Sequence, residues 1–167
     1  MAAAKLATLK TLPFQLSLRI RHPSMDPTQI SQELGIEAEH SFRAGQPRHS
    51  KSGVAPATMH TESYWLAPLS PVSKFGAVPF EPLPNVLISQ HTIDAALERN
   101  LAWALGLSAA QVHKHAAFMH AISSQGGEIS LLITLSAAAL NPFSIPPQVS
   151  RMFGEMGITL EFEITND

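Results

Sequence analysis

The chain has 167 residues, 13 acidic and 11 basic side chains, and no cysteine. This length suits one domain with a single hydrophobic core, and an apolar content of 45% argues against global disorder. Without cysteine there are no disulfides, thiolate metal ligands or cysteine nucleophiles. No apolar run approaches the roughly 18 residues of a membrane-spanning helix. We therefore expect a cytoplasmic protein with a flexible tail over residues 1–13 and a single α+β domain over residues 14–167.

The clearest predicted element is a strand over residues 14–21. Its even positions are apolar and its odd positions are polar. A two-residue period is typical of a strand with one buried face and one solvent-exposed face.

A short helix is expected directly after this strand, over residues 27–34. Asp26 is suited to the N-cap, Pro27 to the first helical position and Gly35 to the residue that stops the helix. This arrangement predicts a strand, a tight turn and a helix as the first unit of the fold.

Two further strands and two long loops fill the middle of the chain. Weak alternation predicts a strand over residues 39–43, and a segment with adjacent aromatic residues predicts another over 60–66. The loops over 44–59 and 67–84 are rich in glycine or proline. Loops of this length are uncommon in a compact domain, so we expect each to be functional or poorly ordered.

A pair of helices is expected next. The first spans residues 93–105 with Thr92 as its cap, and Gly106 breaks it. The second opens with the capping-box pattern of residues 108–111 and ends near Ser124.

The C-terminal part repeats the first unit in a looser form. Strands are predicted over residues 129–135 and 158–164, with a helix between them. The helix opens with Pro-Pro-Gln-Val-Ser at 146–150, which is similar to Pro-Thr-Gln-Ile-Ser at 27–31. We therefore expect pseudo-duplicated strand-helix-strand units in a two-layer, ferredoxin-like α+β sandwich. Its sheet should be mostly antiparallel, with helices on one face.

Eight histidines suggest metal binding, but their spacing does not fit it. His113 and His115 are two residues apart and diverge around a helix, whereas His113 and His120 lie two turns apart. We expect His115 to be partly buried, and we predict no metal site and no cofactor.

The loop over residues 44–59 carries several cations, and we call it the cationic loop. Together with the preceding Arg43 and an aromatic residue of the next strand it gives a candidate ligand site. Its members are Arg43, Arg48, His49, Lys51 and Trp65. Cations on a Gly/Pro loop can hold a phosphate or carboxylate, and Trp65 could line the floor of such a pocket. The alternative for the loop is a solvated segment, which we favour because no phosphate-binding glycine pattern occurs. The alternative for Trp65 is a core residue, which we also favour. No catalytic motif is found either.

Charge is unevenly divided along the chain. Residues 1–51 carry a net charge of +3 and residues 52–167 a net charge of −5. We expect the halves to attract each other, with Arg19 and Arg21 on the polar face of the first strand pairing with Glu161 and Glu163 on the last. This expectation assumes that the first and last strands are neighbours.

Several short motifs together point to a known family. They are Leu18-Arg19-Ile20, Met25-Asp26-Pro27-Thr28-Gln29-Ile30, Leu34-Gly35-Ile36, His40-Ser41-Phe42-Arg43-Ala44-Gly45-Gln46-Pro47-Arg48, Ser63-Tyr64-Trp65 and Met156-Gly157-Ile158. With these motifs the chain resembles, over roughly residues 14–164, a bacterial family catalogued as domain of unknown function 4279. The resemblance supports the fold and implies no particular activity.

The leading functional hypothesis is a non-enzymatic bacterial cytosolic protein that binds another protein, such as an immunity protein that neutralises a toxin. The alternative is a small-ligand or anion-binding domain built from the site named above. Nucleic acid is not an expected partner, because the net charge is −2 and the cations are not interleaved with aromatics. A membrane is not expected either, and the oligomeric state stays open.

Overall fold

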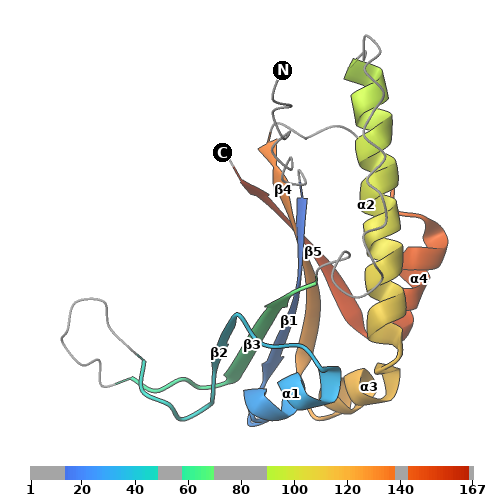
Figure 1. Ribbon diagram of the computed structural model, residues 1–167. Coiled ribbons are helices and arrows are strands. Elements are labelled where there is room, and N and C mark those ends of the chain that lie inside the picture. Colours follow the sequence, from blue (N-terminus) through green and yellow to red (C-terminus); the bar gives the residue numbers. More distant parts are fainter. Residues whose placement is uncertain (1–13, 49–57, 70–89, 138–142, 166–167) are drawn as a thin grey trace, which may run out of the picture.

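The computed structural model describes residues 14–48, 58–69, 90–137 and 143–165. The predicted tail over 1–13 and most of the two predicted loops lie outside these residues. The chain forms β1 (Phe14–His22), α1 (Pro27–Leu34), β2 (His40–Phe42), β3 (Ser63–Pro68), α2 (Gln90–His113), α3 (Ala116–Ser124), β4 (Glu128–Ser136), α4 (Pro147–Glu155) and β5 (Ile158–Thr165), as shown in Figure 1.

The described strands form one mixed sheet in the order β2-β3-β1-β4-β5. The β2–β3, β3–β1 and β1–β4 pairs are antiparallel, and β4 and β5 are parallel. The parallel pair requires a crossover connection, which α4 provides. The fold is therefore α+β, as predicted.

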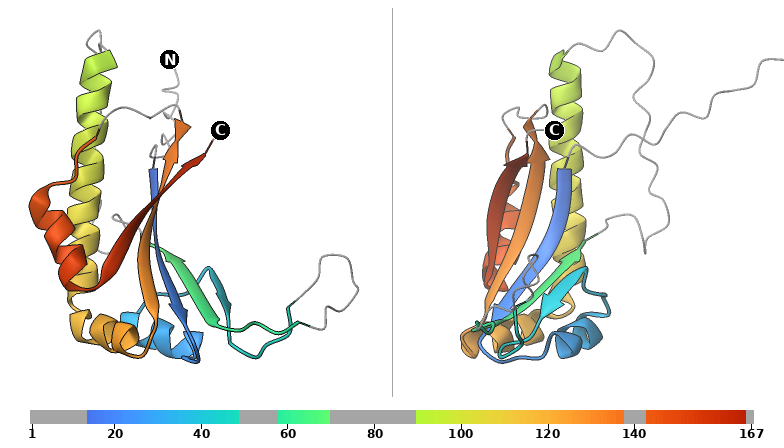
Figure 2. Two further views of the ribbon diagram at one scale, coloured as in Figure 1. Left: turned by 180° about the vertical axis from the view of Figure 1, so that it is seen from behind. Right: turned by 90° about the vertical axis from the view of Figure 1, so that its left-hand side faces the viewer.

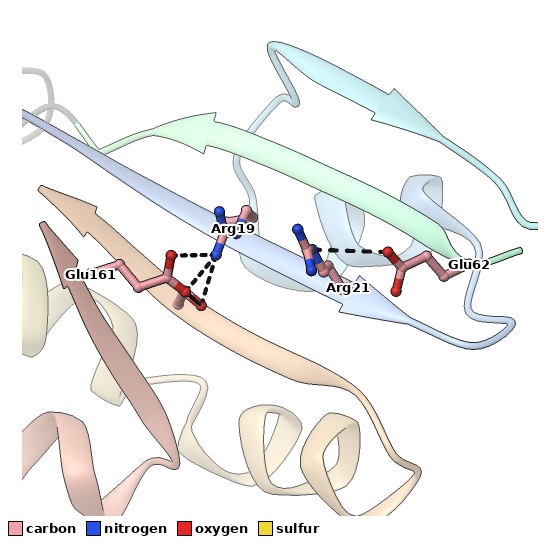
Figure 3. A network of polar contacts seen from close by, with 5 residues as sticks. Arg19, Arg21, Glu62 and Glu161 are labelled. Carbon is pink, nitrogen blue, oxygen red and sulfur yellow. Dashed lines mark hydrogen bonds and ion pairs between the residues drawn. The ribbon is translucent and has the colours of Figure 1, made fainter. Parts of the chain in front are cut away.

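The described helices lie on one side of this sheet (Figures 1 and 2). The even residues of β1 point toward them and are buried, together with the residues of β4 that lie beside them in register, such as Leu131 and Ile133. The opposite side of the sheet carries odd residues of β1 such as Arg19 and Arg21 (Figure 3), and no described helix lies on it (Figure 2). We call this side the open face.

Helix α1 begins and ends where the sequence predicts. The Asp26 carboxylate accepts a hydrogen bond of 2.9 Å from the Thr28 backbone N–H, and Pro27 occupies the first turn. Gly35 follows in the left-handed region at φ 63°. Ile30 and Leu34 are both buried, so the predicted apolar stripe attaches α1 to the sheet.

The predicted helix break at Gly106 is wrong. Helix α2 runs without interruption from Gln90 to His113, so Thr92 does not cap it and Ser108 is a buried residue within it. A glycine costs a helix only about 1 kcal/mol relative to alanine, and burial of neighbours such as Leu105 outweighs this cost. The chain instead turns after His113, and α3 starts at Ala116.

The final strand occupies a different place from the predicted one. β4 lies between β1 and β5, so the expected adjacency of the first and last strands is wrong. Ile158 of β5 is buried, but Phe162 and Ile164 are 46% and 53% exposed. An edge strand has a neighbour on one side only, which leaves the apolar residues of β5 less well covered than those of β1.

The continuity of α2 can be tested at Gly106, with Gly127, which lies between α3 and β4, as a contrasting site. Gly106→Ala should raise the free energy of unfolding by about 0.5–1 kcal/mol, because alanine is the better helix former and its β-carbon would lie 4.0 Å from Val149 Cγ2. Gly127→Ala should lower it by about 1–3 kcal/mol through overpacking, because a β-carbon there would lie 2.5 Å from Ile122 Cγ2. Urea denaturation measures both. A destabilising Gly106→Ala would contradict a continuous helix.

Candidate functional site

Of the predicted ligand residues, the structure describes Arg43, Arg48 and Trp65, while His49 and Lys51 lie outside it. Arg43 Nη1 donates a hydrogen bond of 3.1 Å to Asp26 Oδ2, which connects the end of β2 to the start of α1. The pKa of Asp26 is lowered, first by the hydrogen bond from the Thr28 backbone and in smaller part by the Arg43 charge. Arg43 is therefore already engaged in a structural contact.

Trp65 is a core residue. Its side chain is fully buried on the helix side, and its Nε1–H donates a hydrogen bond of 2.9 Å to Ser31 Oγ of α1. The structure thus bears out the core interpretation that the sequence analysis favoured. It does not bring Trp65 to the surface beside Arg43 and Arg48.

The base of the cationic loop is held by backbone pairing. The Gly45 N–H donates to the His60 carbonyl at 2.8 Å, and the His60 N–H donates to the Gln46 carbonyl at 2.9 Å. The Arg48 N–H donates to the Thr58 carbonyl at 3.2 Å, and the Arg48 side chain is exposed. These backbone hydrogen bonds fix the position of Arg48, which is the last described residue before the gap at 49–57.

A row of stacked rings stands at the β2–β3 end of the sheet. The centroids of Phe42 and His60 are 3.7 Å apart, and those of Phe42 and Tyr64 are 5.0 Å apart. Tyr64 is opposite Arg21 in register, which places the row on the open face. The stacked rings cover one another's faces, so the row presents mainly ring edges, which suit a protein surface better than a stacked base. Sequence reasoning missed this row, because its rings come from two strands and a loop.

The open face also carries an ion pair that spans three strands (Figure 3). Arg19 Nη2 of β1 lies 2.5 Å from both carboxylate oxygens of Glu161 in β5. Between them, the Ser130 hydroxyl of β4 donates a 2.6 Å hydrogen bond to Glu161 Oε1. The pKa of Glu161 is lowered, mainly by the Ser130 hydrogen bond and then by Arg19. The predicted pairing of the first and last strands therefore exists for Arg19, across β4 rather than between neighbours.

Arg21 pairs differently from the prediction. Its Nε lies 3.9 Å from Glu62 Oε1, just before β3, and makes no hydrogen bond within the described residues (Figure 3). Glu163 forms no ion pair with any residue that the structure describes. Among the described residues Arg21 therefore forms no ion pair with Glu161 or Glu163, which corrects the expected contacts. Its charge still contributes, as the smallest cause, to the lowered pKa of Glu161. Arg21 is the less firmly held cation of this face.

The histidines singled out by the sequence lie at the end of α2, in the turn that follows it and within α3. His113 ends α2, His115 precedes α3 and is partly buried as expected, and His120 lies within α3. No group of three His, Asp or Glu side chains that could hold a metal ion occurs within the described ranges. Nor is any described helix long and apolar enough to cross a membrane.

His22 is a buried residue that the sequence analysis did not single out. Its Nδ1 accepts hydrogen bonds from the backbone N–H groups of Ser24, at 3.1 Å, and Met25, at 2.8 Å. Its Nε2 is buried and has no hydrogen-bond partner within the described residues. His22 therefore shapes the turn that leads from β1 into α1.

Comparison with known proteins gives no match: no family model, no curated protein and no solved structure is similar to this chain.

The Arg19–Glu161 contact can be measured with a double-mutant cycle of Arg19→Ala and Glu161→Ala. We expect a coupling of about 0.2–1 kcal/mol near neutral pH, weaker in high salt. The pKa of Glu161 is lower in the folded protein than the ordinary value of 4.5, which applies to the unfolded chain. The stabilisation by the charged carboxylate is therefore complete at a pH above 4.5 and is lost as the pH falls through the pKa of the folded protein. Denaturant midpoints over this pH range give the coupling.

The matched control is the same cycle on Arg21 and Glu62. That pair is longer and more exposed, so its coupling should be close to zero. Equal coupling in the two cycles, or an Arg19–Glu161 coupling that persists in acid, would contradict the assigned contact.

Proposed function

We propose that the chain is a non-enzymatic binding protein of the bacterial cytosol whose partner is another protein. The observation that carries the proposal is that the described helices cover only one side of the sheet, which leaves the open face without a described helix (Figure 2). On this face Arg19 and Glu161 are fixed by Ser130, while Arg21 and Tyr64 lie side by side in register. An open sheet face with preorganised charge and ring edges suits a protein partner, since aromatic and arginine side chains are enriched at protein interfaces.

Within this proposal, β1 to β4 with their helices form a ferredoxin-like unit to which α4 and β5 add a strand. The antiparallel order β2-β3-β1-β4 supports it. Pseudo-duplication has mixed support. Both α1 and α4 begin with proline, but β4 and β5 are neighbours whereas β3 separates β1 from β2. Membership of the family of domain of unknown function 4279, and an immunity-type role, stay predictions.

The proposal predicts that a bacterial protein binds through the open face. Immobilised wild-type chain should capture the same protein reproducibly from a native host lysate, as identified by mass spectrometry. Arg21→Glu should abolish this capture, because it reverses the less firmly held charge of the face. Arg151→Glu on α4 is the matched control, since it changes the net charge equally at an exposed residue of a helix on the other side.

Two results would count against protein binding through this face. One is the absence of any reproducible captured protein. The other is equal loss of capture in the Arg21→Glu and Arg151→Glu variants, which would indicate bulk electrostatics.

A second proposal is anion binding at the cationic loop. It is favoured by the backbone hydrogen bonds that hold the exposed Arg48 at the loop base, but not by Trp65, which is buried. We predict that phosphate, a nucleotide or a small carboxylate raises the melting temperature of the wild type and not that of Arg48→Ala. Arg151→Ala is the control. No ligand-dependent rise in the wild type would exclude this function.

A further inference from the structure

Strand β5 ends the described sheet with a free edge. It pairs with β4 over eight residues and is last in the strand order. The backbone N–H and C=O groups on its other side therefore have no partner strand in the described part of the chain. Such an edge is a template for pairing with another strand, and natural proteins usually block it. The edge at the other end, β2, spans only His40–Phe42.

The two sides of β5 differ in chemistry. On the helix side, Phe162 and Ile164 lie next to the buried Ile133 and Leu135 of β4, yet both are about half exposed. Phe162 packs against Phe143, with ring centroids 5.5 Å apart, which holds its ring in place. A strand added to this edge would continue the apolar layer of the sheet.

The open-face side of β5 is acidic. Glu161 is held by Arg19, while Glu163 is without an ion pair among the described residues. An incoming strand therefore meets apolar and acidic side chains in alternation.

Like charges argue against a second copy of the chain as the occupant. If two copies of β5 paired antiparallel, their apolar side chains would lie on the same face only when even-numbered residues were opposite even-numbered ones and odd opposite odd. In the registers centred on residue 161, 162 or 163, a glutamate of one copy (Glu161 or Glu163) would then be opposite a glutamate of the other. Like charges directly opposite each other destabilise a strand pair.

We propose that the free edge of β5 binds an extended segment of a partner protein in which apolar residues alternate with lysine or arginine. The segment adds a sixth strand to the described sheet, with its apolar side chains beside Phe162 and Ile164 and its cations beside Glu163. Main-chain hydrogen bonds provide affinity and the alternating side chains provide specificity. This inference rests on the proposed protein-binding function and adds the chemical class of the segment that binds.

Peptide titration followed by NMR tests the inference. The probe is a ten-residue peptide that alternates valine and lysine, and the control peptide alternates valine and glutamate. With isotope-labelled wild-type chain, the basic peptide should shift the backbone amide signals of residues 158–165 and slow their hydrogen exchange, whereas the acidic peptide should not. Shifts elsewhere, or no shifts at all, would overturn the proposal.

Charge reversal separates a local contact from bulk attraction. Glu163→Lys should weaken binding of the basic peptide about threefold or more and permit binding of the acidic one. Glu155→Lys changes the net charge equally at an exposed residue of α4, and should leave both affinities near the wild-type values. Equal effects of the two variants would overturn the proposal. So would a wild-type dimer in sedimentation whose amides in residues 158–165 are already protected from exchange without peptide.

The outcomes distinguish this inference from the proposed function. If lysate capture through the open face succeeds and the peptide fails, the protein-binding function stands and the β5 segment is excluded. If the peptide binds β5 and no partner is captured, the edge is a strand-binding site and the open-face function fails.

Discussion

The burial of one face of β1 is the constraint on which the rest of the structure depends. Leu16, Leu18 and Ile20 are almost fully buried, and β1 is the central strand, with β3 on one side and β4 on the other. Because side chains alternate, a shift of one residue in either pairing would expose this apolar set and bury Arg19 and Arg21. The helices must therefore cover the one apolar side, and the charged residues must remain on the other.

Local patterns were enough to predict much of this fold. The period of β1, the Asp26 cap and the Gly35 stop depend on neighbours within a few residues, and the structure agrees with each. The break at Gly106 was wrong because tertiary burial outweighed a weak local preference. Strand order was harder to predict, because the position of β4 between β1 and β5 is determined by pairing across long stretches of chain.

The candidate surfaces were only partly predictable, for a related reason. The sequence indicated that Arg19 and Glu161 are opposite charges on the polar face, and the structure brings them into direct contact. It also adds a hydrogen bond from Ser130 to Glu161, which no pattern had singled out. The cluster of Arg43, Arg48 and Trp65 was inferred from proximity in sequence, yet Trp65 points to the helix side and bonds to Ser31. Proximity along a strand does not determine which side of the sheet a residue occupies unless the register is known.

The side-chain contacts of β1 join residues that are far apart in the sequence, which affects how the protein folds. Arg19 and Ser130 are opposite each other in register although 111 residues separate them, and Arg19 and Glu161 are 142 residues apart. Contacts of such separation form only after large loops have closed, which slows folding. During synthesis, β1 leaves the ribosome long before β4. Until β4 follows, the backbone edge of β1 that pairs with β4 has no partner and the apolar face of β1 is incompletely covered. In this state a chaperone would protect the nascent chain from aggregation.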